Sequence, residues 1–235
     1  MPAYDSQRRR GPGRPRHLEK PGNRDRTPRE EVLDAAARLF TEQGYANTST
    51  REIADAVGIR QASLYYHFPD KADMLAEVLA QTIRPTLQNV NLVEELAEQP
   101  ATALYLLVLL DVRTLVAAPH NSGLLGMLPD VAKEIPDFLT THAELADEYG
   151  RLGAAVASPK VTETVRWRQL GRMLLQNVEL VIGWRSDKSY NGGSGDVLAA
   201  SCLRMCGADD LRIDVAREAA HLLLPQVLLP EVEPG

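Results

Sequence analysis

The chain is poor in cysteine, in aromatic residues and in long apolar runs. Its 235 residues include only two cysteines, Cys202 and Cys206, which is too few for a disulfide-stapled scaffold. The longest apolar stretch, residues 101–118, contains two charged side chains and therefore predicts a buried helix rather than a membrane span. Residues 1–26 have no apolar segment typical of a secretory signal, so we expect a cytoplasmic protein with no membrane partner.

Motifs for catalysis and metal binding are also missing. The chain has no Gly-x-Ser-x-Gly, P-loop or Gly-x-Gly-x-x-Gly sequence, and its five histidines are scattered without His-x-x-x-His spacing. Cys202 and Cys206 are spaced i, i+4 on one predicted helix face. A metal or redox site there is conceivable, but packing is the simpler explanation because an intrahelical disulfide would be strained. We therefore expect no enzyme activity, no cofactor and no metal.

Charge is distributed unevenly along the chain, whose overall net charge is −6. Residues 1–30 carry nine basic and four acidic groups, whereas residues 81–235 carry 13 basic and 20 acidic groups. A basic end ahead of an acidic body fits a protein that contacts a polyanion with one end only. A solvated tail that only aids solubility is the alternative.

The basic end is rich in Arg, Pro and Gly, so residues 1–26 are predicted to form a disordered basic arm. Within the arm, residues 10–16 resemble the Gly-Arg-Pro core of AT-hook peptides. An extended Arg-Pro strip fits the narrow minor groove of A·T-rich DNA, where the negative potential attracts guanidinium groups. Arg14 and Arg16 are therefore candidate DNA contacts.

Two capping boxes mark the first helix starts. In a capping box a Ser or Thr side chain and a Glu side chain each satisfy a backbone N–H of the other residue. The box at residues 27–30 starts a helix whose apolar residues keep helical spacing up to Gly44. The box at residues 49–52 starts a second helix, which Gly58 ends after about two turns.

Two short helices joined across Gly58 are typical of a helix-turn-helix, which presents its second helix to the major groove of DNA. That second helix is predicted over residues 60–68, with Leu64 and Phe68 facing inward. Its outward side carries groups that donate to base edges or phosphates, namely Arg60, Gln61, Ser63, Tyr66 and His67. Plain packing in a helical enzyme would produce a similar pattern. A fourth helix is expected to start at residue 70 or 71.

One set of residues and spacings across 28–75 is more specific. It comprises Ala35-Ala36, Leu39-Phe40, Gly44-Tyr45, Thr48-Ser49-Thr50, Ile53-Ala54, Val57-Gly58-Ile59, Leu64-Tyr65-Tyr66-His67-Phe68 and Lys71. This set resembles the DNA-binding domain of the TetR family of one-component transcriptional regulators. The resemblance implies an all-α fold, with an N-terminal three-helix helix-turn-helix domain and a C-terminal helical domain for ligand binding and dimerisation. The domains would span residues 27–72 and 73–229, with a frayed tail at 230–235.

The resemblance also implies roles for individual residues. Phosphate contacts are expected at helix N-termini, from Thr50, Arg51 and Lys71. Base-edge contacts are expected from Gln61 and Ser63. Contacts to the DNA backbone, a base or a thymine methyl group are expected from Tyr65, Tyr66 and His67.

Two positions depart from the family pattern. Arg60 stands where the family usually has a Ser or Thr N-cap, and Ala62 stands where it often has Gly. Loss of the cap costs about 1 kcal/mol. In exchange, Arg60 places a long cation at the groove, where it would read guanine or contact a phosphate.

Beyond residue 88 every strong pattern is helical, and no sheet is predicted. Helices are expected near residues 101–117, 136–153, 160–185, 196–207 and 209–224. The helix at 161–185 is apolar on more than one face, which predicts burial on several sides. The resemblance implies that this helix and residues 211–224 form the four-helix dimer bundle that is typical of the TetR family. An ordinary monomer core is the alternative.

Three of these helices, at 101–117, 136–153 and 160–185, are expected to surround a pocket for a small, largely apolar effector. The candidate polar lining residues are Asp111, Arg113, His120, His142, Gln176 and Asn177. The candidate apolar lining residues are Met127, Phe138 and Trp167. Each of these could equally be an ordinary core or surface group.

Together with these patterns, the resemblance implies a homodimeric transcriptional regulator, in the first instance a repressor, that binds a pseudo-palindromic operator in double-stranded DNA. A small-molecule effector would favour a state in which the two recognition helices are wrongly spaced. The alternative is an architectural DNA-binding protein, in which the basic arm dominates binding and no effector acts.

Overall fold

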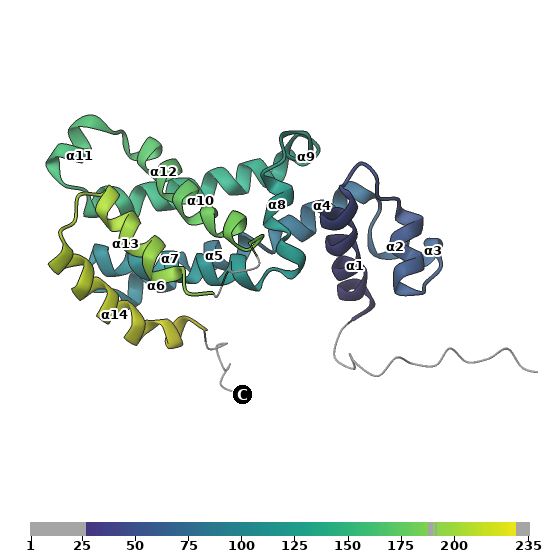
Figure 1. Ribbon diagram of the computed structural model, residues 1–235, viewed down its shortest axis with the longest axis horizontal. Helices are drawn as coiled ribbons and strands as arrows, with labels where there is room; N and C mark the ends of the chain where they lie inside the picture. The colour runs from purple at the N-terminus through teal and green to yellow at the C-terminus, as the bar shows by residue number, and fades with distance from the viewer. Residues whose placement is uncertain (1–26, 188–189, 191, 229–235) are drawn as a thin grey trace, which may run out of the picture.

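The structure, a computed structural model, describes residues 27–187, 190 and 192–228. The predicted basic arm, with Arg14 and Arg16, and the predicted tail at 230–235 lie outside the described residues. Over the part of the chain that is described, the protein is helical and contains no strand, which confirms the all-α prediction. The N-terminal helices lie at one end of the molecule, and α11 (Pro159–Thr164) lies at the other (Figure 1).

The N-terminal unit is built on α1 (Pro28–Gln43), α2 (Thr50–Val57), α3 (Gln61–His67) and α4 (Lys71–Ala80). Both predicted capping boxes are present. Thr27 Oγ1 accepts a hydrogen bond from the Glu30 N–H at 3.3 Å, and Ser49 Oγ accepts one from the Glu52 N–H at 3.2 Å. Gly58 ends α2 with φ 81°, a left-handed conformation that glycine adopts without a Cβ clash.

Side chains from α1, α2 and α3 meet in one apolar core. Phe40, Ile53 and Leu64 have no exposed surface, and Phe68 is also buried, as the sequence predicts for the last two. Helices of seven or eight residues are not stable alone, so this shared core is what holds α2 and α3 in place.

The C-terminal body consists of shorter and longer helices around a central one. Its helices are α5 (Arg84–Gln88), α6 (Val90–Leu96), α7 (Pro100–Ala117), the 3-10 turn η1 (Pro119–Asn121), α8 (Gly123–Gly126), α9 (Pro129–Lys133), α10 (Pro136–Val156), α11, α12 (Trp167–Trp184), α13 (Gly195–Met205) and α14 (Asp210–Leu228). The central helix α7 packs against α10, α12, α13 and α14. By length and composition α7 could cross a membrane, but it is mostly buried inside the body, which makes it the core helix that the sequence predicts.

The prediction of one continuous helix over 160–185 is wrong. Val165 and Arg166 have extended backbones (φ −123°, ψ 126° and φ −70°, ψ 144°), and they separate α11 from α12. The apolar spacing continues through this break, and neither Gly nor Pro marks it, so periodicity alone could not reveal it. The short helices α5, α6, α8 and α9 are further elements that the sequence analysis did not predict.

Two glycines allow α10 and α12 to pack closely. A Cβ atom on Gly171 would clash with the carbonyl oxygen of Ala146 and would lie 2.6 Å from the backbone nitrogen of Gly150. A Cβ atom on Gly150 would lie 2.6 Å from the carbonyl oxygen of Trp167. Because the opposing atoms belong to the backbone, a side chain at either position would push the two helices apart.

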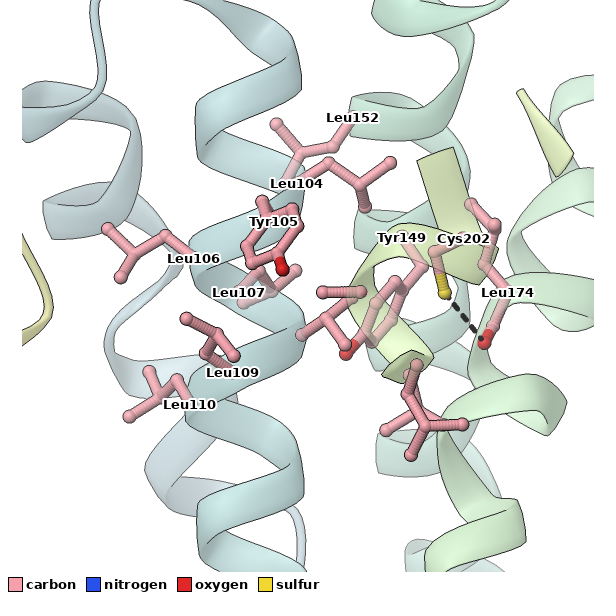
Figure 2. Packing of buried hydrophobic residues seen from close by; sticks show 14 of the residues in the cluster. Leu104, Tyr105, Leu106, Leu107, Leu109, Leu110, Tyr149, Leu152, Leu174 and Cys202 are labelled. Atoms are coloured by element: carbon pink, nitrogen blue, oxygen red, sulfur yellow. Dashed lines mark hydrogen bonds between the residues drawn. The ribbon is translucent and has the colours of Figure 1, made fainter. Parts of the chain in front are cut away.

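Both cysteines lie in the core around α7. Cys202 and Cys206 have no exposed surface, and the Cys202 Sγ lies 3.8 Å from the carbonyl oxygen of Leu174 (Figure 2). Burial raises the pKa of both thiols to about 12. Neither thiol is therefore ionised at neutral pH, which supports a packing role over a redox or metal role.

The close approach of α10 and α12 leads to a test with a matched control on the same helix. Gly171→Ala is expected to lower the free energy of unfolding by about 2 kcal/mol or more, because the new methyl group overlaps backbone atoms. Gly183→Ala meets no atom within 4 Å and is expected to leave stability unchanged or raise it by up to about 1 kcal/mol. Urea unfolding of both variants measures this, and equal stabilities would contradict the described packing.

Candidate functional site

Helix α3 lies at the end of the molecule, away from the C-terminal body (Figure 1). Tyr66 is 87% exposed, and Gln61, Ser63 and Tyr65 are also exposed. The opposite side of the same helix is fixed by the buried Leu64. The helix therefore presents a polar and aromatic surface that no other described element covers.

Hydrogen bonds tie the N-terminus of α2 to α3. Gln61 Nε2 donates to Thr50 Oγ1 at 2.9 Å and lies 3.4 Å from the Tyr65 hydroxyl oxygen. The hydroxyl groups of Thr50 and Tyr65 are 3.1 Å apart. Three residues predicted to contact DNA thus form one exposed network, which sets the orientation of their side chains before any partner binds.

Cations flank this network. Arg60 occupies the N-cap position of α3 without a side-chain cap hydrogen bond, as expected for an arginine there, and its side chain is exposed. The exposed Arg51 lies 3.8 Å from Asp55 on the same helix. The rings of Tyr66 and His67 meet edge to face, with centroids 5.4 Å apart. This surface can donate hydrogen bonds and offers positive charge, as an anionic duplex requires.

The side chain of Lys71 already makes hydrogen bonds within the protein, which leaves it less free to contact a phosphate. Its Nζ donates to the carbonyl oxygens of Tyr45 and Thr48, at 2.8 and 3.0 Å, and lies 4.2 Å from the centre of the Tyr45 ring. These bonds tie the start of α4 to the loop between α1 and α2. One of the three ammonium protons remains for an external acceptor. A phosphate contact by Lys71 therefore stays a prediction.

A cavity of about 170 Å³ lies inside the body, between α7, α8, α10, α12 and the segment that follows α4. Its polar lining residues are Thr82, Asp111, His142 and Glu179. Its apolar lining includes Ile83, Met127, Phe138, Leu175 and Ile182. Four of the residues predicted to line a pocket, Asp111, Met127, Phe138 and His142, are thus brought together.

The other predicted pocket residues lie elsewhere. Arg113 and Gln176 are exposed, and Arg113 stands about 200° around α7 from Asp111. Asn177 faces α13, where its side-chain nitrogen lies 3.3 Å from the Leu198 carbonyl oxygen. His120 lies in η1, 3.3 Å from Asp34 of α1.

Trp167 is far from the cavity along α12. It lines a separate hollow of about 520 Å³ beside α11, together with Arg166 and Arg168. The Arg168 guanidinium stacks on the Trp167 ring at 4.9 Å. Helix α11, beside which this hollow lies, is at the end of the body that is remote from α3 (Figure 1).

Asp111 is a buried carboxyl group with neutral partners. Its Oδ1 accepts a hydrogen bond from Thr86 Oγ1 at 3.0 Å, and its Oδ2 accepts one from the Tyr149 hydroxyl at 2.8 Å. Burial raises the pKa of Asp111 to about 7, and these two hydrogen bonds only partly offset that effect. Asp111 therefore changes its charge near neutral pH.

His142 and Glu179 form the second polar feature of the cavity. His142 Nε2 lies 2.6 Å from Glu179 Oε1, and this contact raises the pKa of His142 above its usual value. The sequence analysis did not single out Glu179, Thr82 or Ile83. A usable signal existed for Glu179, because it is the only acidic residue of α12 and stands among apolar neighbours.

The cavity is joined to the N-terminal unit by α4 and α8. Met74, Leu75 and Leu79 of α4 are buried in the N-terminal core, while Thr82 and Ile83 just beyond α4 line the cavity. Leu125 of α8 belongs to the same N-terminal core, although its neighbours Gly123 and Gly126 line the cavity. A molecule in the cavity would therefore touch the elements that position the helix-turn-helix.

The turn between α7 and α8 adds a polar link. His120 and Asn121 both adopt left-handed backbones, with φ 55° and 53°. The Arg185 side chain holds this turn by donating to the carbonyl oxygens of Leu115 and Ala118, at 2.6 and 3.0 Å, and to Asn121 Oδ1 at 3.1 Å. The end of α12 is thus fastened to the segment that contacts α1.

The N-terminal unit of the chain matches known bacterial regulatory proteins. Residues 32–78 match the family profile "Bacterial regulatory proteins, tetR family". The HTH-type transcriptional repressor KstR2 of Rhodococcus jostii is 53% identical over 51 residues, which are 22% of this chain and 25% of that protein. The first curated relatives are thus matched over only about a quarter of their own length.

Longer matches cover the body as well. The fatty acid metabolism regulator protein of Bacillus subtilis is 24% identical over 171 residues, which are 68% of this chain and 86% of that protein. The crystal structure of Mycobacterium smegmatis AmtR superposes with a TM-score of 0.76 and 36% identity, and it covers 88% of this chain and 98% of that one. The fatty acid degradation regulator FadR of Bacillus halodurans shares the fold, with a TM-score of 0.61 at 20% identity.

The buried carboxyl group gives stability a defined pH dependence. The folded protein retains the Asp111 proton between about pH 4 and 7, whereas the unfolded chain releases it, so the free energy of unfolding falls as pH rises through this window. The fall is of the order of 4 kcal/mol and levels off above pH 7. Asp111→Asn is expected to remove it. Only the smaller fall from His142 would remain, because its raised pKa makes the folded state lose stability above about pH 6.5.

Urea unfolding at half-unit steps from pH 5 to 8 measures this effect. The matched control is Asp147→Asn, the same substitution at a half-exposed position on α10, 3.5 Å from Arg168 and outside the cavity lining. The control is expected to keep the wild-type slope. An Asp111→Asn variant with the wild-type slope would show that Asp111 does not titrate in this range.

Proposed function

Because the chain belongs to the TetR family of bacterial regulatory proteins, we propose that it is a cytoplasmic DNA-binding repressor controlled by a small molecule. Two copies would bind a pseudo-palindromic operator, with the two α3 helices in successive major grooves about 34 Å apart. A ligand in the cavity would favour a conformation in which this spacing is lost.

The observation that carries this proposal is the surface of α3. Its outward side chains are polar or aromatic, they are exposed at the end of the molecule, and the network of Thr50, Gln61 and Tyr65 already orients several of them. The match to transcriptional repressors covers this same unit. A packing helix in an enzyme would instead bury a second face.

A homodimer is supported by apolar side chains at the surface of the body. On α14, Leu211 and Leu222 are 75% and 76% exposed, and Val215 between them is also exposed. Their spacing of four and seven residues places them on one face of the helix. Val197 of the adjacent α13 is exposed as well. We propose that this face pairs with the same face of a second copy.

A second apolar face is the alternative. Met173, Leu180 and Trp184 are exposed on α12, which the sequence analysis expected to share the dimer bundle with residues 211–224. In the described structure α13 packs between α12 and α14. One flat interface is therefore more simply built from α13 and α14 than from α12 and α14.

Control by a ligand is supported by the position of the cavity. Thr82 and Ile83 line it directly beyond α4, and α4 packs into the core that holds α2 and α3. A ligand that fits only one position of this segment would shift the N-terminal units of both copies. Differential affinity of the ligand for the two positions is the only requirement.

The recognition surface can be tested without disturbing the fold. The double variant Gln61→Ala, Tyr66→Ala removes two exposed side chains and is expected to weaken operator binding by at least 100-fold in gel-shift titrations, because base-edge contacts are lost. The matched control is Lys160→Ala, Glu163→Ala on the exposed surface of α11. Both proteins should elute as wild type on gel filtration, and an unchanged operator affinity in the first would exclude α3 as the reading helix.

The dimer face can be distinguished from its alternative with two charge insertions. Leu222→Glu on α14 is expected to convert the protein to a monomer, because it buries a carboxylate in the proposed interface. Leu180→Glu on α12 is expected to leave the dimer intact. Light scattering after gel filtration reads out the mass of each variant. The reverse outcome would move the interface to α12, and two unaffected dimers would exclude both faces.

A further inference from the structure

We propose that the cavity takes a small organic cation, a protonated amine of about six to ten non-hydrogen atoms, whose N–H groups donate to the carboxylates of Asp111 and Glu179. This inference rests on the proposed function only in calling the bound molecule an effector. The site itself is defined by the cavity and its lining.

The charge of the lining favours a cation. Two carboxyl groups, Asp111 and Glu179, line the cavity, whereas His142 is the only cationic lining residue. His142 is already bound to Glu179 at 2.6 Å. The lining therefore has no unused positive charge for an anionic ligand, and it has one carboxyl group more than its own cation can neutralise.

Asp111 lacks a cationic partner of its own. Its oxygen atoms accept hydrogen bonds from the hydroxyl groups of Thr86 and Tyr149, both neutral. Each carboxylate oxygen can accept a second hydrogen bond. An ammonium group in the cavity would supply the missing positive charge at a site from which water is largely excluded, where such an interaction is strong.

The remaining walls fit the carbon part of an amine. Ile83, Met127, Leu175 and Ile182 are apolar, and Phe138 adds an aromatic ring. An aromatic ring and a carboxylate are the two groups that attract an organic cation. The volume of about 170 Å³ sets the size, since a cavity of about 150 Å³ in another protein holds benzene.

Binding of a cation has a consequence for protons. In the empty cavity Asp111 is largely protonated below pH 7, because burial disfavours its charge. An ammonium ion reverses this preference, so the Asp111 proton passes to solvent as the ligand binds. The groups facing Asp111 are Tyr149 and His142 on α10, Glu179 on α12 and Cys202 on α13. Of these groups, His142 loses its positive charge as pH rises. This loss also favours binding of a cationic ligand at higher pH.

Three probes of similar shape test the ligand class on the protein of residues 1–235. Benzylamine carries a cation, benzyl alcohol is neutral and benzoate is an anion. Titration calorimetry at pH 7.5 is expected to show benzylamine binding at least tenfold more tightly than either of the others. Its affinity is expected to fall roughly 20-fold between pH 7.5 and 5.5, as the Asp111 proton has to be displaced. Buffers of different ionisation enthalpy would report the released proton directly.

Two variants and one control assign the effect to the cavity. Asp111→Asn is expected to abolish both the preference for the amine and the proton release. Glu179→Gln is expected to reduce the preference for the amine. This second variant tests the proposal if Asp111→Asn does not fold. Asp147→Asn, at a half-exposed position on α10 that does not line the cavity, should bind as wild type. Equal or tighter binding of benzyl alcohol or benzoate, or no binding of any probe, would overturn the assignment of an amine.

Different results would contradict the proposed ligand class and the proposed regulatory role. If benzylamine binds with the expected preference but leaves operator affinity unchanged in gel shifts, the cation site is supported. Its role as the effector site is then excluded. If a neutral or anionic probe binds best and releases the operator, the effector cavity stands and the amine is excluded.

Discussion

The structure depends on one segment, α4 and the residues that directly follow it, which connects the N-terminal core to the internal cavity. Met74, Leu75 and Leu79 are buried with the side chains of α1, α2 and α3, and four residues later the same chain segment lines the internal cavity with Ile83. Because α4 is buried in the N-terminal core and leads directly into residues that line the cavity, a displacement of those residues would be passed on to the helix-turn-helix. Leu125 of α8 makes a second connection of the same kind, and the Arg185 side chain fastens a third through η1. The position of α3 is thus a property of the whole body.

The polar groups beside the cavity are held in place by hydrogen bonds from neighbouring helices. A fully buried aspartate is unfavourable for a protein core, since its charge is desolvated and its neutral form adds little packing. Asp111 is nevertheless held by Thr86 and by Tyr149, each from a different helix, in a geometry that fixes both carboxyl oxygens. The hydrophobic core around α7 is large enough to bear this cost (Figure 2). A carboxyl group that is desolvated by burial and lines a cavity next to the connecting segment is consistent with the proposed ligand site.

The N-terminal unit could be predicted from sequence because its signals are local. Both capping boxes and the glycine at position 58 act within a few residues, and the structure reproduces each of them. The helix boundaries of the C-terminal body were harder to predict, because tertiary packing rather than local sequence decides where its helices end. At Val165 the chain leaves the helix although the apolar spacing continues, and directly beyond this break α12 packs against α10 at the short distance that Gly150 and Gly171 allow. No residue near the break carries that information.

The cavity shows the same division between local and distant information. Asp111 and His142 could be selected as polar residues on apolar helices, but the choice between Asp111 and Arg113 depends on how far α7 is rotated about its axis, which is set by its neighbours. Glu179 was missed because a carboxylate on a helix is usually solvated, and only the position of His142 on α10 makes it part of the site. Sequence periodicity can thus propose the helices that surround a cavity. Which side chains face one another across it is determined by the packing angles between helices, and these follow from contacts among residues far apart in the chain.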